Sequence, residues 1–76
     1  MIGVAKAQSI ADRCDQLALE AAQLSAQLHG EGPFPGSTRV HQSLRGARAE
    51  LDRAAGALRD VEKVLRDWQQ RAQNPG

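Results

Sequence analysis

The sequence is poor in aromatic and sulfur-containing residues. Its 76 residues include one phenylalanine, one tryptophan, no tyrosine and a single cysteine, Cys14. A lone cysteine excludes an intrachain disulfide, so the disulfide framework that many small extracellular domains need is absent. The apolar residues are mainly alanine and leucine, with a few valines and isoleucines, a composition typical of helices rather than of β-sheets.

Long apolar stretches are absent as well. No run of apolar residues is long enough to span a membrane. The opening segment, Met-Ile-Gly-Val-Ala-Lys, lacks the basic and apolar regions of a cleavable signal peptide. We therefore expect no membrane partner, and a protein that either stays in the cytoplasm or is exported without a cleavable signal peptide.

Two heptad stripes are the most informative feature that the sequence does contain. Both stripes alternate steps of three and four residues, which is the spacing of a seam between packed helices. They mirror each other about a nine-residue break, so that residue numbers in facing pairs sum to about 68 if the chain reverses there. The first stripe comprises Gly3, Ala7, Ile10, Cys14, Leu17, Ala21, Leu24 and Leu28, and the second Val40, Leu44, Ala47, Leu51, Ala54, Leu58, Val61, Leu65, Trp68 and Ala72.

These stripes predict an all-α fold, an antiparallel two-helix coiled-coil hairpin that forms a single domain over residues 1–76. The first helix is expected over about residues 4–28, the loop over 29–37 and the second helix over about 38–73. In this register, layers of large residues such as Leu17 with Leu51 alternate with layers of small ones. Cys14 is then a small apolar residue of the seam.

Turn and capping residues support the same boundaries. Gly30 is expected just after the first helix, where a positive φ angle is needed. Pro33 and Pro35 prevent the helix from continuing. Ser37 or Thr38 is expected to cap the second helix, and Asn74-Pro75-Gly76 is the expected stop signal.

A hairpin with a single seam has little core, so we expect it to complete a four-helix bundle by association. The partner is either a second copy or another helical protein. Trp68 belongs to a part of the second stripe that has no facing residue in the first. It either caps the open end against Met1, Ile2 and Val4, or it anchors an interface, where tryptophan is enriched. The expected interface residues are Leu19, Ala22, Ala26, Gly46, Ala49, Gly56, Ala57, Val64 and Trp68.

The sequence does not favour catalysis, a cofactor or a metal. A single hairpin offers no cleft in which polar groups converge. His29 and His41 flank the loop with Glu31 nearby, which is too few ligands for a structural zinc site. The loop glycines do not match a phosphate-binding loop, and no Lys-Ser or Lys-Thr follows them.

Nucleic-acid binding is also disfavoured. The predicted second helix carries eight basic residues, but five acidic residues are interleaved with them around the helix. No aromatic side chain is placed for base stacking, and the net charge of the whole chain is only +1.

The loop sequence Phe34-Pro35-Gly36 lies between two long helices of a chain without a signal peptide. In this it resembles the Trp-x-Gly helical-hairpin proteins of bacterial type VII secretion, with phenylalanine in place of tryptophan. The resemblance implies a dimeric four-helix bundle and a role as an exported protein or as a partner of one, with Phe34 and Gly36 as the loop motif. The Tyr-x-x-x-Asp/Glu export signal of that family has no counterpart in the tail.

The sequence thus predicts a non-catalytic helical interaction module that associates through exposed Ala, Leu and Val faces. A secretion-associated partner or substrate is one form of this function. The alternatives are a cytosolic coiled-coil adaptor or regulatory subunit of a larger complex, and a nucleic-acid-binding protein that uses the basic second helix.

Overall fold

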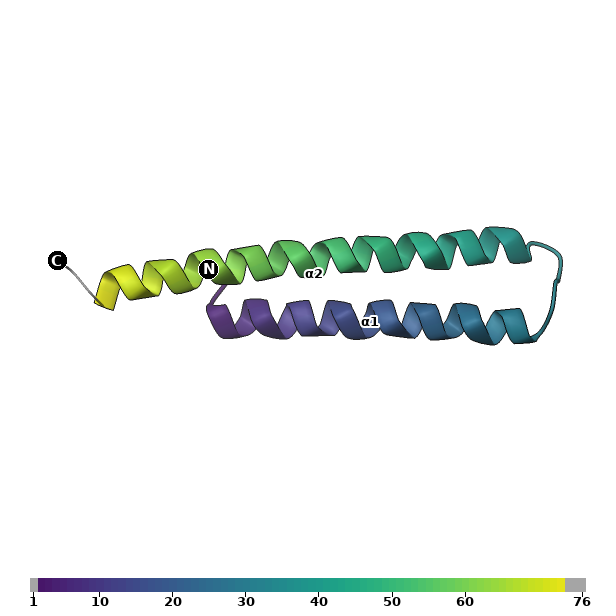
Figure 1. The fold of residues 1–76 in the computed structure, drawn as a ribbon, viewed down its shortest axis with the longest axis horizontal. Helices are drawn as coiled ribbons and strands as arrows, with labels where there is room; N and C mark the ends of the chain where they lie inside the picture. The colour runs from purple at the N-terminus through teal and green to yellow at the C-terminus, as the bar shows by residue number, and fades with distance from the viewer. Residues whose placement is uncertain (1, 74–76) are drawn as a thin grey trace.

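The computed structural model describes residues 2–73, which form two long helices lying side by side and antiparallel (Figure 1). Helix α1 spans Val4–Gly30 and helix α2 spans Ser37–Gln73. The predicted all-α helical hairpin is therefore confirmed. The molecule is a rod with principal extents of 64 × 16 × 14 Å. Met1 and the expected stop signal Asn74-Pro75-Gly76 lie outside the described residues.

The reversal after α1 differs from the sequence-based expectation. The prediction that Gly30 ends the first helix with a positive φ is wrong, because Gly30 is still helical and the glycines with positive φ are Gly32 (79°) and Gly36 (83°). The amide of Glu31 donates to the Leu28 carbonyl at 3.2 Å. The amide of Gly32 likewise donates to the His29 carbonyl at 3.1 Å. The chain thus keeps a helix-like path through Glu31, and the first residue with a positive φ is Gly32, just before Pro33.

Gly36 precedes the first residue of α2 and occupies the capping position. Its carbonyl accepts a hydrogen bond from the Val40 amide at 3.1 Å, and the Ser37 amide donates to the Phe34 carbonyl at 2.9 Å. Ser37, one of the two expected capping residues, is instead the first helical residue. The chain therefore turns into α2 through the backbone of a glycine rather than through a hydroxyl cap.

The seam between the helices is built around alanine. The buried residues within the described chain are Ala7, Ala11, Ala18 and Ala21 of α1 and Ala55 of α2, each at most 8% exposed. Because alanine side chains are short, the two helix backbones can approach closely along the rod. Half-buried seam residues complete the stripe: Cys14, Ser25 and Leu28 in α1, and Ser37, His41, Leu44, Leu51, Leu58, Glu62 and Leu65 in α2.

Half of the predicted seam positions are correct and half are displaced by one residue. The heptad positions of Ala7 in α1 and of Leu44 in α2 lie in the seam as predicted. The other heptad position is taken in most heptads by the following residue, such as Ala11 instead of Ile10 and Ala55 instead of Ala54, whereas Arg48 after Ala47 is exposed. The predicted seam residues Ile10, Leu24, Val40 and Val61 are 36–50% exposed, so their assignment to the core is wrong.

Side-chain size explains this displacement. Alanine and serine at 11, 18 and 25 allow closer helix packing than the large side chains that precede them, Ile10, Leu17 and Leu24. The predicted alternation of large and small layers is therefore replaced by a seam of small α1 residues against the leucines of α2. The predicted seam residues Ile10, Leu24, Val40 and Val61 are turned toward one outer side of the hairpin.

The hairpin is asymmetric in length. The C-terminal part of α2 extends past the beginning of α1 (Figure 1), and it carries Trp68, which is 57% exposed. Within residues 2–73, neither helix contains a stretch that is apolar enough to cross a lipid bilayer.

Candidate functional site

One long side of the hairpin carries exposed large apolar residues, and we call it the open apolar face. In each helix these residues hold the heptad position immediately before a seam residue, as Ile10 precedes Ala11 and Val40 precedes His41. In two antiparallel helices that face each other, the same offset from the seam points to the same side of the pair. The face comprises the exposed residues Ile10 and Leu24 and the half-buried Leu17 of α1, and Val40, Val61 and Trp68 of α2 with the exposed Ala47 and Ala54 between them.

Half-buried leucines join the two rows of the open apolar face. Leu44, Leu51, Leu58 and Leu65 lie at the edge of the seam next to the exposed row of α2. They pack toward α1 but remain partly accessible to solvent, because the alanines opposite them are too short to cover them. The face is therefore continuous in apolar residues across the width of the hairpin.

The opposite side of the hairpin is polar and holds its cross-helix ion pairs. Arg59 of α2 donates hydrogen bonds to the Asp15 carboxylate of α1 and lies 3.5 Å from a carboxylate oxygen of Asp12. The hydrogen bond that Arg59 donates to the Asp15 carboxylate raises the pKa of the Arg59 guanidinium above its ordinary value. All three groups are largely exposed, so the pairs orient the helices more than they stabilise them.

The overhanging end of α2 adds a shallow groove to the open apolar face. Its lining comes from a single helix and is formed by Asp60, Val61, Val64, Leu65 and Trp68. Val64 is 51% exposed and Trp68 is 57% exposed. α1 therefore leaves both side chains largely uncovered, whereas Leu65 of the same groove is half-buried.

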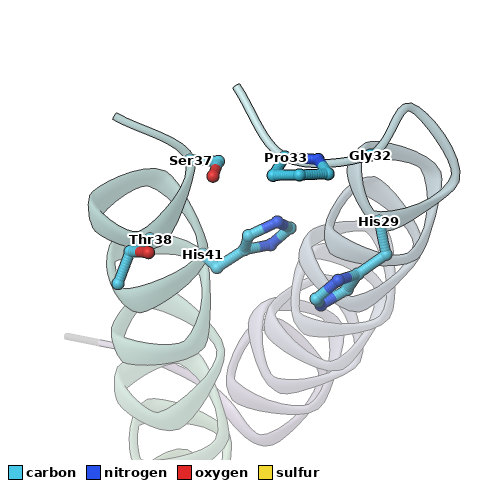
Figure 2. A pocket seen from close by; sticks show the side chains of 6 residues that line it. All are labelled: His29, Gly32, Pro33, Ser37, Thr38 and His41. Carbon is cyan, nitrogen blue, oxygen red and sulfur yellow. The ribbon is translucent and has the colours of Figure 1, made fainter. Parts of the chain in front are cut away.

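A second hollow lies at the closed end of the hairpin (Figure 2). The end of α1, the loop and the first turn of α2 surround it, and it is lined by His29, Gly32, Pro33, Ser37, Thr38 and His41. The imidazole rings of His29 and His41 stack, with centroids 4.0 Å apart and planes inclined by 12°. Ser25 Oγ lies 3.2 Å from His41 Nδ1, in hydrogen-bonding contact across the seam.

The stacked histidines come one from each helix and meet at the closed end of the hairpin. The lone pair of an imidazole nitrogen lies in the ring plane, so two nearly parallel stacked rings do not aim their nitrogens at one point. Within residues 2–73, no three His, Cys, Asp or Glu side chains gather as metal ligands would. Cys14 is a half-buried free thiol of the seam.

The interface residues expected from the sequence fall on more than one side. Ala57, Val64 and Trp68 border or belong to the open apolar face. On the polar side of α1, the row of Asp12 and Asp15 continues with Leu19, Ala22 and Ala26. Ala49 and Gly56 lie on the same polar side, in α2 beside Arg59. Gly46 lies on the side of α2 that faces away from α1. A Cβ atom added at Gly46 or Gly56 would meet no atom within 4 Å.

Sequence reasoning missed the exposure of Ile10, Leu24, Val40 and Val61, because it placed them inside the seam. One signal was available in the sequence, namely the alanine or serine at 11, 18 and 25, which forms an equally regular heptad row of smaller residues. Phe34 of the loop motif is half-buried, and Gly36 has the positive φ described above.

No protein-family model, curated protein or solved structure matches this chain.

Proposed function

We propose that this chain is a non-catalytic helical interaction module that binds a second pair of helices through its open apolar face. The observation that carries the proposal is the clustering of Ile10, Leu24, Val40, Val61 and Trp68 on one side, each 36–57% exposed. Single exposed apolar residues need no explanation, but a continuous apolar face along a rod marks an interaction surface.

The size of the open apolar face supports this function. The product of the two larger extents of the rod, 64 Å and 16 Å, gives a footprint of about 1,000 Å². A stable protein interface buries roughly 800 Å² on each partner. The buried core within the described residues consists only of alanines, so a second apolar layer would add much of the hydrophobic stabilisation that the lone hairpin lacks.

Capture experiments test the proposal. A tagged chain is co-expressed with an untagged copy and purified from its host extract, alongside the double variant Leu24→Glu/Val61→Glu. We expect the wild type to retain a stoichiometric helical partner, either a second copy or another protein, and the double variant to lose it. Leu19→Glu, which places the same charge at a 59% exposed leucine on the polar side, serves as the matched control.

Two results would contradict the proposal. In the first, the folded wild-type chain retains neither a second copy nor any other protein. In the second, the Leu24→Glu/Val61→Glu variant retains the same partner as the wild type while Leu19→Glu loses it, which would move the interaction to the polar side.

We also propose kinship in function with the exported hairpins of type VII secretion as a second candidate. The observation that favours it is the loop motif, in which half-buried Phe34 and positive-φ Gly36 stand at the tip between two long helices. In a bacterial host with such a secretion system, the chain should then appear in the culture medium. Accumulation only inside cells, with or without the secretion ATPase, would contradict this candidate and leave an adaptor or regulatory subunit.

A further inference from the structure

We propose that the occupant of the open apolar face is a second copy of this chain, stacked face to face and running antiparallel to the first. This inference rests on the proposed function and names its partner. In the arrangement, a two-fold axis crosses the rod at right angles opposite Leu17, so that each α1 lies over the partner's α1 and each α2 over the partner's α2. Three features of the face support it independently.

The first feature is the symmetry of the α1 row. Leu17 stands midway between Ile10 and Leu24, seven residues from each. A two-fold axis at Leu17 therefore brings Ile10 against the partner's Leu24, and the same contact recurs on the other side of the axis. Both residues are exposed in the single hairpin, at 36% and 50%, and each would gain an apolar neighbour.

The second feature is that the four residues of the α2 row that precede Trp68 have a midpoint at the same level. Val40 pairs with the partner's Val61, and Ala47 with the partner's Ala54, about one midpoint between residues 50 and 51. The cross-helix contacts Ser25–His41 and Asp15–Arg59 set Leu17 level with residues 49–57 of α2. The midpoint between residues 50 and 51 lies within this range, so one axis serves both helices.

In this arrangement, the part of α2 that extends past α1 contacts the loop of the second copy. With the axis between residues 50 and 51, Trp68 reaches the level of the partner's Phe34 in the loop. Trp68 is 57% exposed and Phe34 is only half-buried in the single hairpin. Stacking an aromatic side chain at each end would close both ends of the four-helix bundle.

The third feature is the charge at the rim of the face. Arg13 and Glu20 both lie along the outer edge of the α1 row, and neither has an ion-pair partner within residues 2–73. The side chain of Arg13 only donates to Gln16 Oε1 at 3.1 Å. The two-fold axis at Leu17 places Arg13 of each copy beside Glu20 of the other copy, so the dimer has two such pairs of opposite charge.

Two measurements test the arrangement on the full chain. Sedimentation equilibrium at tens of micromolar should give twice the chain mass of 8.2 kDa. Spin labels on Glu31→Cys in a Cys14→Ala background should then lie about 40 Å apart, because each label is fourteen residues from the axis. Labels on Gln16→Cys, next to the axis, should lie under roughly 20 Å apart.

Charge exchange supplies a test of register. Arg13→Glu and Glu20→Arg should each raise the dimer dissociation constant by roughly tenfold, because each turns two attractive pairs into repulsive ones. The double variant Arg13→Glu/Glu20→Arg should restore the wild-type value. Lys63→Glu, which changes an exposed cation outside the face, should leave the constant unchanged.

The outcomes separate this inference from the proposed function. A dimer whose Glu31→Cys labels lie within roughly 25 Å of each other is parallel and overturns the antiparallel arrangement while the interaction module stands. A folded monomer that binds a different helical protein through the open apolar face also overturns only the second-copy inference. A folded monomer that binds nothing overturns both proposals.

Discussion

Enlarging a buried alanine in the seam should strongly destabilise the hairpin. Ala11 of α1 and Ala55 of α2 are each 1% exposed, so surrounding atoms cover their methyl groups almost completely. Leucine at position 11 adds three carbon atoms that must be accommodated by off-rotamer side chains or by separation of the helices. Such overpacking typically costs about 1–3 kcal/mol.

That cost is large relative to the total stability of a chain of this size. A 76-residue domain has a free energy of unfolding of about 4–11 kcal/mol. For a domain of this length, each 1 kcal/mol shifts the melting temperature by roughly 4–8 °C, so a 2 kcal/mol loss corresponds to roughly 8–16 °C. Thermal and urea unfolding followed by circular dichroism at one fixed protein concentration would measure the effect.

Ala5→Leu is the matched control, because Ala5 lies on α1 but is exposed. It should change the free energy of unfolding by only a few tenths of a kcal/mol, since alanine and leucine have similar helix propensities. Equal or higher stability of Ala11→Leu than of Ala5→Leu would refute the alanine seam. That result would instead favour the seam predicted from the sequence, in which position 10 rather than 11 faces α2.

Three further predictions concern the helix surface, the loop and the ion pairs. Gly46→Ala and Gly56→Ala should each stabilise the hairpin by about 1 kcal/mol in urea unfolding, because a Cβ atom meets no neighbour at either position; loss of partner binding at unchanged stability would mark these glycines as contacts. Gly36→Ala should destabilise by about 1 kcal/mol because its φ is 83°, and Gly36→Asn should be milder; equal melting temperatures for all three chains would contradict the left-handed geometry. Arg59→Gln should cause a small loss of stability that shrinks in 1 M salt. Because the pKa of Arg59 is raised in the folded state, its ion pairs contribute their full stability at any pH below the pKa that Arg59 has in the unfolded chain, and this contribution is lost only as pH rises through the folded-state pKa. The stability lost in Arg59→Gln should therefore not vary between pH 6 and 9, and a clear change across that window would assign the lost stability to another group.

The sequence by itself determined the hairpin. Steps of three and four residues over two long segments require helices, and Pro33 and Pro35 together with the loop glycines require a reversal between them. These are local constraints, since each acts within a few residues of the chain. For that reason the bounds of α1 and α2 lie within a few residues of the expected ones, and the differences are confined to the reversal, where Gly32 and Gly36 have the positive φ angles and Gly36 takes the expected capping position of Ser37.

Only the tertiary structure decided which side of each helix faces the other. Ile10 and Ala11, like Val40 and His41, offer heptad rows of equal regularity, and the choice between them depends on how closely the two backbones approach. Alanine and serine on α1 permit the closer approach, so the small row packs inside and the large row turns outward. This rotation by one residue converts Ile10, Leu24, Val40 and Val61 from expected core into the open apolar face, because packing between helices is not encoded within either helix alone.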